Sequence, residues 1–249
     1  MITWSGYEWS AIMHGTTMHP GQPWMWYSEE CATVDEQDIL HLTMKKDPKE
    51  IKHWNGNTYN PKYAVGTLRS ETAFDYGTFS ADIICPEGYN LWPSFWMTGK
   101  DAWPPEIDIM EAWSDDDDYF KWMIAQPPYI LPSWRTTNNV HYNRMVEGEY
   151  VRTSIGSRNA SWFRQCKNPA SDFINYECVW EPDRILIKAN KHVLRTVSKE
   201  VANMLTKNIK DGGGHEMYVI FNLWIKNPDQ YKIELYSDMQ IKNFKYKPL

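Results

Sequence analysis

Three carboxylates lie close together near the middle of the chain, in the run Glu106-Ile-Asp-Ile-Met-Glu111. Side chains alternate between the two faces of a β-strand, so a strand here places Glu106 and Asp108 on one face and two isoleucines on the other. Strict alternation would bury Glu111 in the core, where an unpaired carboxylate is costly. One extra residue in a β-bulge, most naturally Met110, returns Glu111 to the face of the other two acids. The pattern therefore predicts three acids in a row on one exposed face.

Such a row is suited to the hydrolysis of a glycosidic bond. Two carboxylates that flank a sugar linkage suffice, one as nucleophile or base and the other as acid. A third acid between them can hydrogen-bond the nucleophile. Because crowded carboxylates cannot all ionise easily, one pKa rises and that group becomes a proton donor near neutral pH. The alternative is an edge strand with a solvated acidic face, which the neighbouring aromatic and proline residues make less favourable.

The acidic run resembles the bulged signature of glycoside hydrolase family 16, which includes laminarinases, agarases, porphyranases and carrageenases. The resemblance extends in order over nearly the whole chain. It includes Tyr76-Gly-Thr-Phe79, Leu91-Trp-Pro-Ser-Phe-Trp96, Trp180-Glu-Pro-Asp183 and 218–224. The six-residue acidic motif is specific, and its combination with the Trp-Pro-x-Phe-Trp motif is stronger still.

The resemblance implies a role for each acid. Glu106 would be the nucleophile, Asp108 its assistant and Glu111 the acid/base. It also implies hydrolysis with retention through a covalent glycosyl-enzyme intermediate, which requires the two reacting carboxyl groups to lie about 5–5.5 Å apart.

Aromatic residues are the main candidates for sugar binding, because flat amphipathic rings can hold the apolar faces of sugars. The chain has 14 tryptophans and 15 tyrosines. Alternation in 91–97 sets Trp92 and Trp96 on one face, although Trp96 could belong to the core instead. The resemblance also favours a histidine in the cleft, against the alternative of a structural histidine. We expect sugar contacts from Trp92, Trp96, Trp103, Trp134, His141, Asn222 and Trp224.

The charges that the groove carries bear on the identity of the polysaccharide. A sulfated galactan would call for arginine in the groove, since guanidinium binds such oxyanions in two-pronged fashion. Arg69 and Arg135 are the candidates, and an ordinary salt bridge is the alternative for each. Pro105 before the nucleophile and the sequence of 221–226 depart from the usual laminarinase pattern.

These departures favour a retaining endo-β-glycosidase acting on a red-algal galactan of the agar, porphyran or carrageenan type. Three alternatives stay open: a laminarinase-like endo-β-1,3-glucanase, a transglycosylase, and a non-catalytic carbohydrate-binding sandwich. Binding alone requires no paired acid and nucleophile, so an intact acidic triad counts against the last of these.

Short strands separated by turns predict an all-β fold, a jelly-roll sandwich of two antiparallel sheets with a concave substrate cleft. A groove open at both ends would give internal cleavage. We expect strands at 39–44, 66–72, 79–85, 91–97, 218–225 and 239–246, a hairpin at 185–194 and one helix at 196–208. Residues 1–36 are expected to be mainly irregular, with a short strand or a rim of the cleft at 24–27. Residues 45–63 are expected to form a loop, and 146–172 to be loop and edge.

Length and charge limit the class of protein. The chain has 249 residues, a net charge of −6 and a pI of about 5.7. These values indicate one catalytic domain over residues 1–249 and argue against nucleic acid as a partner. No apolar run approaches the length of a membrane span. We expect a monomer with a polysaccharide substrate. The start lacks signal-peptide features, and we interpret the chain as the mature domain of a secreted, periplasmic or cell-surface enzyme.

No cofactor is expected to be required, and the four cysteines lack metal-ligand spacing. Cys166 and Cys178 could form a disulfide, or all four could be buried thiols. The run Asp115–Asp118 is interpreted as a solvated loop, with a metal site or repulsion of anionic polymers as the alternatives. The resemblance also suggests a structural calcium ion, and Asp238 could be one of its ligands.

Overall fold

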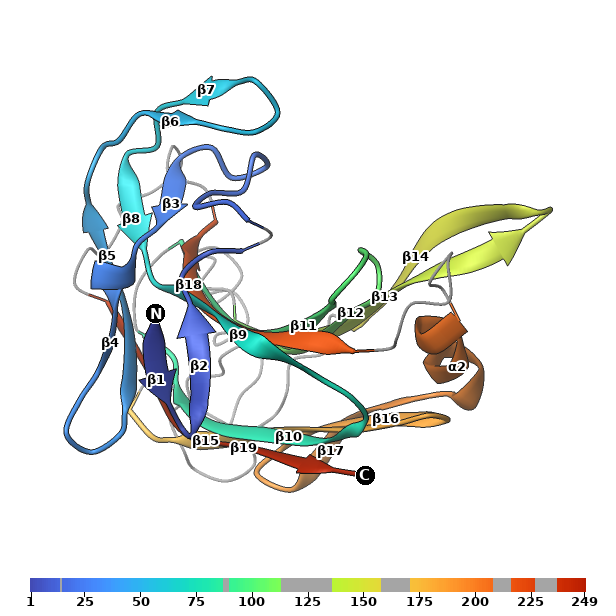
Figure 1. Ribbon diagram of the computed structural model, residues 1–249. Helices are drawn as coiled ribbons and strands as arrows, with labels where there is room; N and C mark the ends of the chain where they lie inside the picture. Colours follow the sequence, from blue (N-terminus) through green and yellow to red (C-terminus); the bar gives the residue numbers. More distant parts are fainter. Residues whose placement is uncertain (14, 87–89, 113–135, 158–170, 208–215, 227–236) are drawn as a thin grey trace, which may run out of the picture.

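Two β-sheets lie face to face in the computed structural model (Figure 1). The structure describes residues 1–13, 15–86, 90–112, 136–157, 171–207, 216–226 and 237–249. All the sheet pairings in this part of the chain are antiparallel except one short pair. The expected all-β sandwich is therefore confirmed.

One sheet has eight strands and contains the acidic run near its middle. Its strands, in spatial order, are β1 (Ile2–Trp4), β2 (Tyr7–Ser10), β9 (Thr67–Phe74), β18 (Met217–Ile225), β11 (Leu91–Gly99), β12 (Glu106–Ala112), β13 (Thr136–Val146) and β14 (Glu149–Ser157). Strand β12 lies between β11 and β13, so side chains from both neighbours flank its acids.

The second sheet has nine strands and forms the other layer. Its main path is β17 (His192–Val197), β16 (Arg184–Ala189), β15 (Ile174–Glu181), β10 (Gly77–Ile84), β19 (Asp238–Pro248), β5 (Leu40–Lys46), β8 (Tyr63–Val65) and β3 (Met25–Tyr27). Strand β4 (Ala32–Val34) pairs with β5 beside the short 3-10 helix η1 (Glu29–Cys31). A separate two-stranded hairpin consists of β6 (Ile51–Lys52) and β7 (Thr58–Tyr59).

One hydrophobic core lies between the two sheets. Alternation along β11 buries Phe95 and Met97, and Phe95 stacks on Phe221 of β18 with ring centroids 4.5 Å apart. From the other sheet, Phe79 and Trp180 are fully buried in the same core. Helix α2 (Lys199–Lys207) packs against β13 and β16, one strand from each sheet. The inner face of the eight-stranded sheet is thus closed off, which leaves only its outer face to carry a site.

The expected strands and hairpin are present, and α2 lies within the predicted helix. Two expectations were wrong. Residues 1–36 contain β1, β2 and β4 besides the short strand β3, because their buried apolar residues complete both sheets. The segment 45–63, expected to be a loop, includes the β6–β7 hairpin. In 146–172, β14 is an edge strand of the eight-stranded sheet, in agreement with the expected loop and edge, and it pairs along its length with β13.

Candidate active site

A β-bulge in β12 brings the three acids to one face. Against β11, Trp96 pairs with Asp108 and Phe95 with Met110, so Ile109 has no partner on that strand. Against β13, the register also shifts between Asp108 and Glu111. The predicted bulge is confirmed between the second and third acids, but the residue left unpaired against β11 is Ile109 and not Met110. Both residues are buried because the insertion turns two consecutive apolar side chains into the core.

The row of Glu106, Asp108 and Glu111, called here the acidic row, lies between matching rows on its two neighbours. On β11 the partners are Thr98, Trp96 and Ser94 in that order. On β13 the partners are His141, Asn139 and Thr137. The pairing therefore gives each acid one polar or aromatic pairing partner on either side.

An indole N–H donates to each of the two outer acids. Trp103 Nε1 donates to Glu106 Oε2 at 2.8 Å, and Trp92 Nε1 donates to Glu111 Oε1 at 3.0 Å. Thr137 Oγ1 donates a longer bond of 3.4 Å to the second oxygen of Glu111. A donor that bonds the charged form of a carboxyl group favours that form. The two outer acids are thus held in position and stabilised as anions.

Burial acts in the opposite direction and dominates. Burial, together with the negative charge of Asp108, raises the pKa of Glu106 to about 8. Burial and the charge of Glu111 raise the pKa of Asp108 well above its ordinary value. Burial also raises the pKa of Glu111, against the hydrogen bond from Trp92. The acidic row therefore holds at least one proton near neutral pH, as crowded carboxylates were expected to do.

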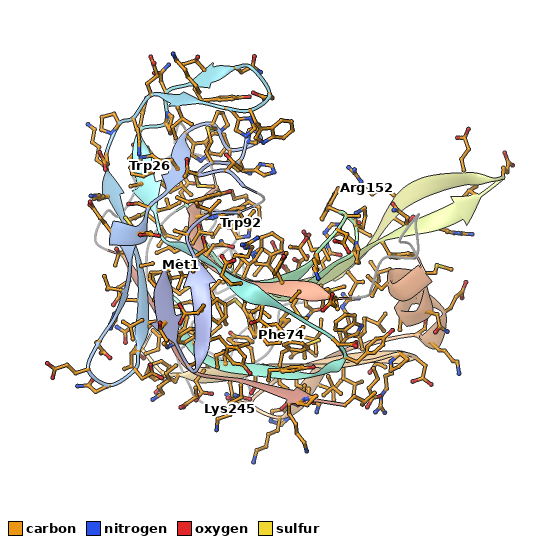
Figure 2. All side chains as sticks on the ribbon, in the orientation of Figure 1. Met1, Trp26, Phe74, Trp92, Arg152 and Lys245 are labelled. Atoms are coloured by element: carbon orange, nitrogen blue, oxygen red, sulfur yellow. The ribbon has the colours of Figure 1, made fainter. Side chains whose placement is uncertain are left out.

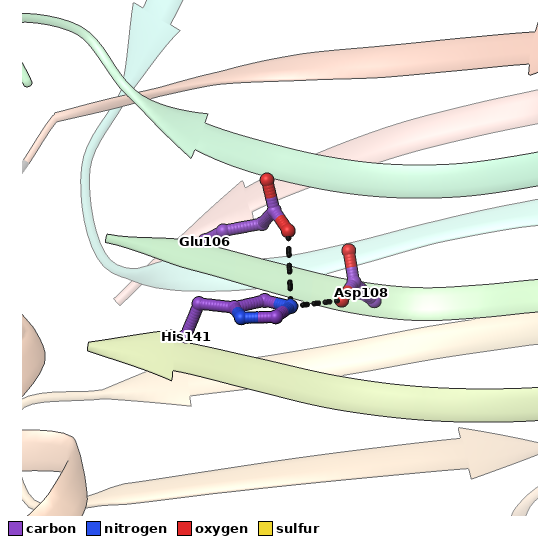
Figure 3. A group of neighbouring side chains, drawn as sticks. All are labelled: Glu106, Asp108 and His141. Atoms are coloured by element: carbon purple, nitrogen blue, oxygen red, sulfur yellow. Dashed lines mark ion pairs between the residues drawn. The ribbon is translucent and has the colours of Figure 1, made fainter. Parts of the chain in front are cut away.

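His141 lies between two of the acids (Figure 3). Its Nε2 atom is 3.3 Å from Glu106 Oε1 and 3.5 Å from Asp108 Oδ2. The amide nitrogen of Asn139 lies 2.9 Å from the same Nε2 atom. Ligand atoms of Glu106, Asp108 and His141 all lie within 4.8 Å of one another, so the three could also hold a metal ion. The expectation that the reaction requires no metal cofactor stays a prediction.

A cavity of about 690 Å³ opens above the acidic row, and all three acids line it. Its other walls come from five parts of the chain. They include Met13, His19 and Gln22 from the segment before β3, Trp92, Ser94 and Trp96 of β11, the loop residues 99–103, Arg152 of β14, and Asn222 and Trp224 of β18. A concave site with a few convergent polar groups and perturbed pKa values is typical of an active site.

The structure brings most of the expected sugar-contact residues together. Trp92, Trp96, Trp103, Asn222 and Trp224 all line the cavity. Trp96 Nε1 donates to the side-chain oxygen of Asn222 at 2.7 Å, which fixes one indole of the cavity floor. Trp224 is only 7% exposed, and its Nε1 donates to Thr67. Trp224 therefore supports the floor more than it offers a surface to a ligand.

The arginine candidates are distributed differently from the expectation. Arg69 is not among the cavity-lining residues; it forms an ion pair with Glu71 at 2.9 Å and lies over the ring of Tyr218. Trp134 and Arg135 lie outside the described residues, so their roles stay predictions. Arg152 lines the cavity instead, with its guanidinium carbon 4.1 Å from the ring centroid of Trp103 (Figure 2).

Sequence analysis missed Arg152 and the wall formed by Met13, His19 and Gln22. The pairing of Asn143 with Arg152 would have identified the arginine, because alternation along β14 then places it on the face of His141. No local signal identifies the other three residues. They reach the cavity only because β3 packs beside β8 in the second sheet.

The remaining expectations concern cysteines and a metal ion. Three cysteines are free and buried, namely Cys31, Cys85 and Cys178. Cys166 and the run Asp115–Asp118 lie outside the described residues. Asp238 accepts hydrogen bonds on Oδ2 from His41 and Gln240. Its role as a calcium ligand stays a prediction. None of the helices in the described part of the chain is long and apolar enough to cross a membrane.

Comparison with known proteins gives a family match over most of the chain. Residues 19–237 match the profile of Glycosyl hydrolases family 16. A galactan endo-beta-1,3-galactanase from Flammulina velutipes is 36% identical over 101 residues, which cover 36% of this chain and 41% of that relative. The chain thus aligns with less than half the length of that relative.

Two solved structures share the fold at low sequence identity. The laminarinase catalytic domain from Thermotoga maritima superposes with a TM-score of 0.59 at 20% identity, over 92% of this chain and 84% of that one. The kappa-carrageenase from Pseudoalteromonas carrageenovora superposes with a TM-score of 0.60 at 17% identity, over 88% of this chain and 82% of that one. At these identities the similarity concerns the fold alone.

Proposed function

The chain belongs to glycosyl hydrolases family 16, and from this premise we propose that it is a retaining endo-β-galactanase. The observation that carries the proposal is the acidic row itself, where two half-buried glutamates line one cavity and each accepts an indole hydrogen bond. The proposed substrate is a β-linked galactan, and the proposed place of action is outside the cytoplasm, where such a polymer is found.

In the first proposed step, a carboxylate oxygen of Glu106 attacks the anomeric carbon of the sugar. The carboxyl proton of Glu111 passes to the glycosidic oxygen, which leaves with the bonding electron pair. The step requires an ionised Glu106 and a protonated Glu111. The Trp103 N–H favours the anion on Glu106 against the effect of burial, so the ionised fraction of Glu106 grows as the pH approaches its pKa of about 8. Burial favours the proton on Glu111.

The second proposed step releases the sugar. Ester formation removes the negative charge of Glu106, and this loss lowers the pKa of Glu111, because the two carboxyl groups interact electrostatically. Glu111 then takes a proton from water, whose oxygen attacks the anomeric carbon and displaces the Glu106 carboxylate. Two displacements restore the original configuration.

Asp108 is proposed to carry the proton that the acidic row retains near neutral pH. It is buried, and its pKa is raised well above the ordinary value by burial and by Glu111. A protonated Asp108 can donate a hydrogen bond and adds no negative charge beside the nucleophile. His141 is proposed to hold the orientation of Glu106 and Asp108, since its Nε2 atom contacts both.

A galactan is favoured over a glucan by two features. The relative from Flammulina velutipes that matches part of the chain acts on a galactan. Pro105 and the sequence of 221–226 also depart from the laminarinase pattern. The second candidate is an endo-β-1,3-glucanase, which the structural similarity to a laminarinase domain keeps open.

The test is a polysaccharide panel with β-1,3-galactan, agarose, porphyran, carrageenan and β-1,3-glucan. We expect reducing ends to appear fastest from a galactan, with products of mixed length. Proton NMR during the first minutes should show the β-anomer of the new reducing end. A first-formed α-anomer contradicts retention, and cleavage of the glucan alone contradicts the galactan assignment. Adding an acceptor sugar and analysing the products separates hydrolysis from transglycosylation.

A further inference from the structure

Outside the cavity, the β6–β7 hairpin carries the most exposed large hydrophobic side chain of the described residues. Trp54 is 79% exposed, more than either chain terminus and about twice as much as Trp103 in the cavity at 41%. Tryptophan is usually highly buried, because its ring offers a large apolar area. An indole presented to solvent therefore requires an explanation.

The hairpin holds Trp54 in a defined position. The backbone N–H of His53 donates to the carbonyl of Asn57 at 2.9 Å, and that of Gly56 donates to the carbonyl of His53 at 3.0 Å. Gly56 has a φ of +85°, a conformation that glycine adopts without strain. The His53 ring is buried and lies 5.1 Å from the Trp54 ring. The indole thus rests on a packed neighbour in a closed turn.

Polar side chains follow Trp54 in the same turn. Asn55 and Asn57 are exposed, and their amide nitrogens donate to the hydroxyl of Tyr59 at 3.0 and 3.4 Å. Protein-docking surfaces present a contiguous apolar patch, which a single ring among amides does not. A flat ring edged by amide groups suits a ligand with apolar faces and many hydroxyls, such as a sugar ring.

The hairpin is connected to the wall of the cavity. Gln22 lines the cavity, and two residues later the carbonyl of Trp24 accepts hydrogen bonds from the backbone N–H groups of Lys62 and Tyr63. Trp26 Nε1 donates to the carbonyl of Asp47 at 2.9 Å, and Lys49 lies over its ring. These contacts fix both ends of the segment 47–63 to Trp24 and Trp26, which follow the cavity-lining Gln22 in sequence. In Figure 1 the hairpin lies beyond the segment joining β2 to β3, and its turn points toward the side of β13 and β14.

A polymer must extend beyond the catalytic cavity. The cavity volume of about 690 Å³ is that of a site for one small ligand. An endo-acting enzyme therefore leaves the outer sugars of its substrate against the rim. We propose that Trp54, with Asn55 and Asn57, forms a second sugar-binding platform, which holds a distal part of the same polysaccharide chain. The proposal rests on the proposed function for the identity of the ligand, a neutral stretch of β-linked polysaccharide.

The experiment compares Trp54→Ala and Trp54→Tyr with the unchanged protein. Affinity gel electrophoresis in the Glu106→Gln background measures binding to each polysaccharide of the panel without cleavage. Kinetics in the active background use the best polysaccharide and its shortest cleaved oligosaccharide. Val193→Ala is the control, because Val193 is 56% exposed on β17 of the other sheet.

We expect Trp54→Ala to weaken polymer binding about tenfold, and to raise KM for the polymer by a similar factor. The kcat value and the kinetics on the short oligosaccharide should stay within about twofold. Trp54→Tyr should retain most of the affinity, since it keeps a ring. Binding equal to that of the unchanged protein, or an equal loss on long and short substrates, overturns the platform.

The two proposals fail in distinguishable ways. Cleavage without any dependence on Trp54 removes the platform and leaves the enzyme. Polymer retardation that depends on Trp54 without any cleavage removes the proposed function and leaves the platform. If no polymer of the panel retards the Glu106→Gln protein, the platform is overturned.

Discussion

Two groups of one histidine and two carboxylates lie on the two sheets and behave oppositely. On the eight-stranded sheet, His141 contacts Glu106 and Asp108 at 3.3 and 3.5 Å. On the nine-stranded sheet, His41 contacts Asp238 and Asp35 at 2.9 and 3.3 Å. The pKa values of Glu106 and Asp108 are raised, whereas that of Asp35 is lowered.

The environment explains the difference, since the residue types are nearly the same. Asp35 accepts hydrogen bonds from the backbone N–H groups of Ile39 and Gln37, and the Ile39 bond is the main cause that lowers its pKa. Burial alone would lower the pKa of His41, but its bonds to Asp238 and Asp35 raise it overall. The His41 group is therefore an ion pair near solvent. In the His141 group, the two carboxyl groups are shielded from water and retain protons to higher pH.

Glu106→Gln should give the largest difference between the two groups. Gln keeps the shape of Glu106 but cannot attack the anomeric carbon. We expect kcat on the best polysaccharide to fall on the order of 10⁴-fold or more. The matched control, Asp238→Asn, should stay within about threefold. Activity of Glu106→Gln near that of the unchanged protein would remove the nucleophile assignment.

Glu111→Gln should have a large effect that depends on the leaving group. Loss of a general acid costs about 10²–10⁴-fold when the leaving group needs a proton. An aryl glycoside with a nitrophenol leaving group needs little protonation, so formation of the glycosyl-enzyme should be much less affected. The measurement is a comparison of kcat/KM on polysaccharide and on the aryl glycoside. Equal losses on both substrates would contradict the acid role.

Stability should change in the opposite direction from activity. The pKa of Glu106 is about 8 in the folded protein and about 4.5 in the unfolded chain. The unfolded state therefore loses its proton first, and this group reduces the free energy of unfolding as pH rises from about 4.5 to 8. Glu106→Gln removes this reduction in the free energy of unfolding.

We expect Glu106→Gln to raise Tm at pH 7, by about 2–4 °C for each kcal/mol of relieved cost. The difference should disappear below about pH 4, where the glutamate is neutral in both states. Thermal melts of both proteins at pH 4 and pH 7 provide the check. A lower Tm for the variant at pH 7 would show that burial does not penalise this carboxylate.

The two indole donors should have separate effects on the pH profile. Trp103→Phe removes the N–H that stabilises ionised Glu106, so the acidic limb of kcat/KM should move to higher pH. Trp92→Phe removes the N–H that stabilises ionised Glu111, so the alkaline limb should move to higher pH. We expect shifts of about half a pH unit each.

Trp96→Phe is the control for both variants, because its N–H donates to Asn222 and to neither acid. Movement of the opposite limb in each variant would mean that the roles of Glu106 and Glu111 are exchanged.

His41→Gln should have the smallest effect. A histidine whose pKa is raised on folding stabilises the protein fully below its unfolded pKa, and this contribution is lost as pH rises through the folded pKa. The pair is partly exposed, so we expect a loss of about 1 kcal/mol or less. Urea melts should show it at pH 5.5 and a smaller loss at pH 8.5. A larger loss at the higher pH would contradict the ion-pair interpretation.

Much of the fold and the centre of the site followed from local patterns. Alternation in 91–97 predicted that Trp92 and Trp96 share a face, and both line the cavity. Alternation in 218–225 predicted the same for Asn222 and Trp224. These predictions succeeded because strand geometry fixes which neighbours in sequence share a face, whatever the partner strand is.

Contacts between distant segments were not predictable in this way. Arg69 was favoured from its residue type, yet its ion pair is with Glu71 and the cavity contains Arg152. The selection depends on the register between β13 and β14, in which Asn143 pairs with Arg152. β1 and β2 were missed because β2 joins the sheet by pairing with β9, a strand distant in sequence.

The sequence alone determined that three acids occupy one face of a bulged strand, because an odd number of inserted residues reverses the alternation of side chains. Only the tertiary structure decided what those acids do. Packing buries them under a cavity, gives indole donors to two of them and raises their pKa values. The pKa of a carboxyl group depends on its solvation and its charged neighbours, and both are properties of the folded chain.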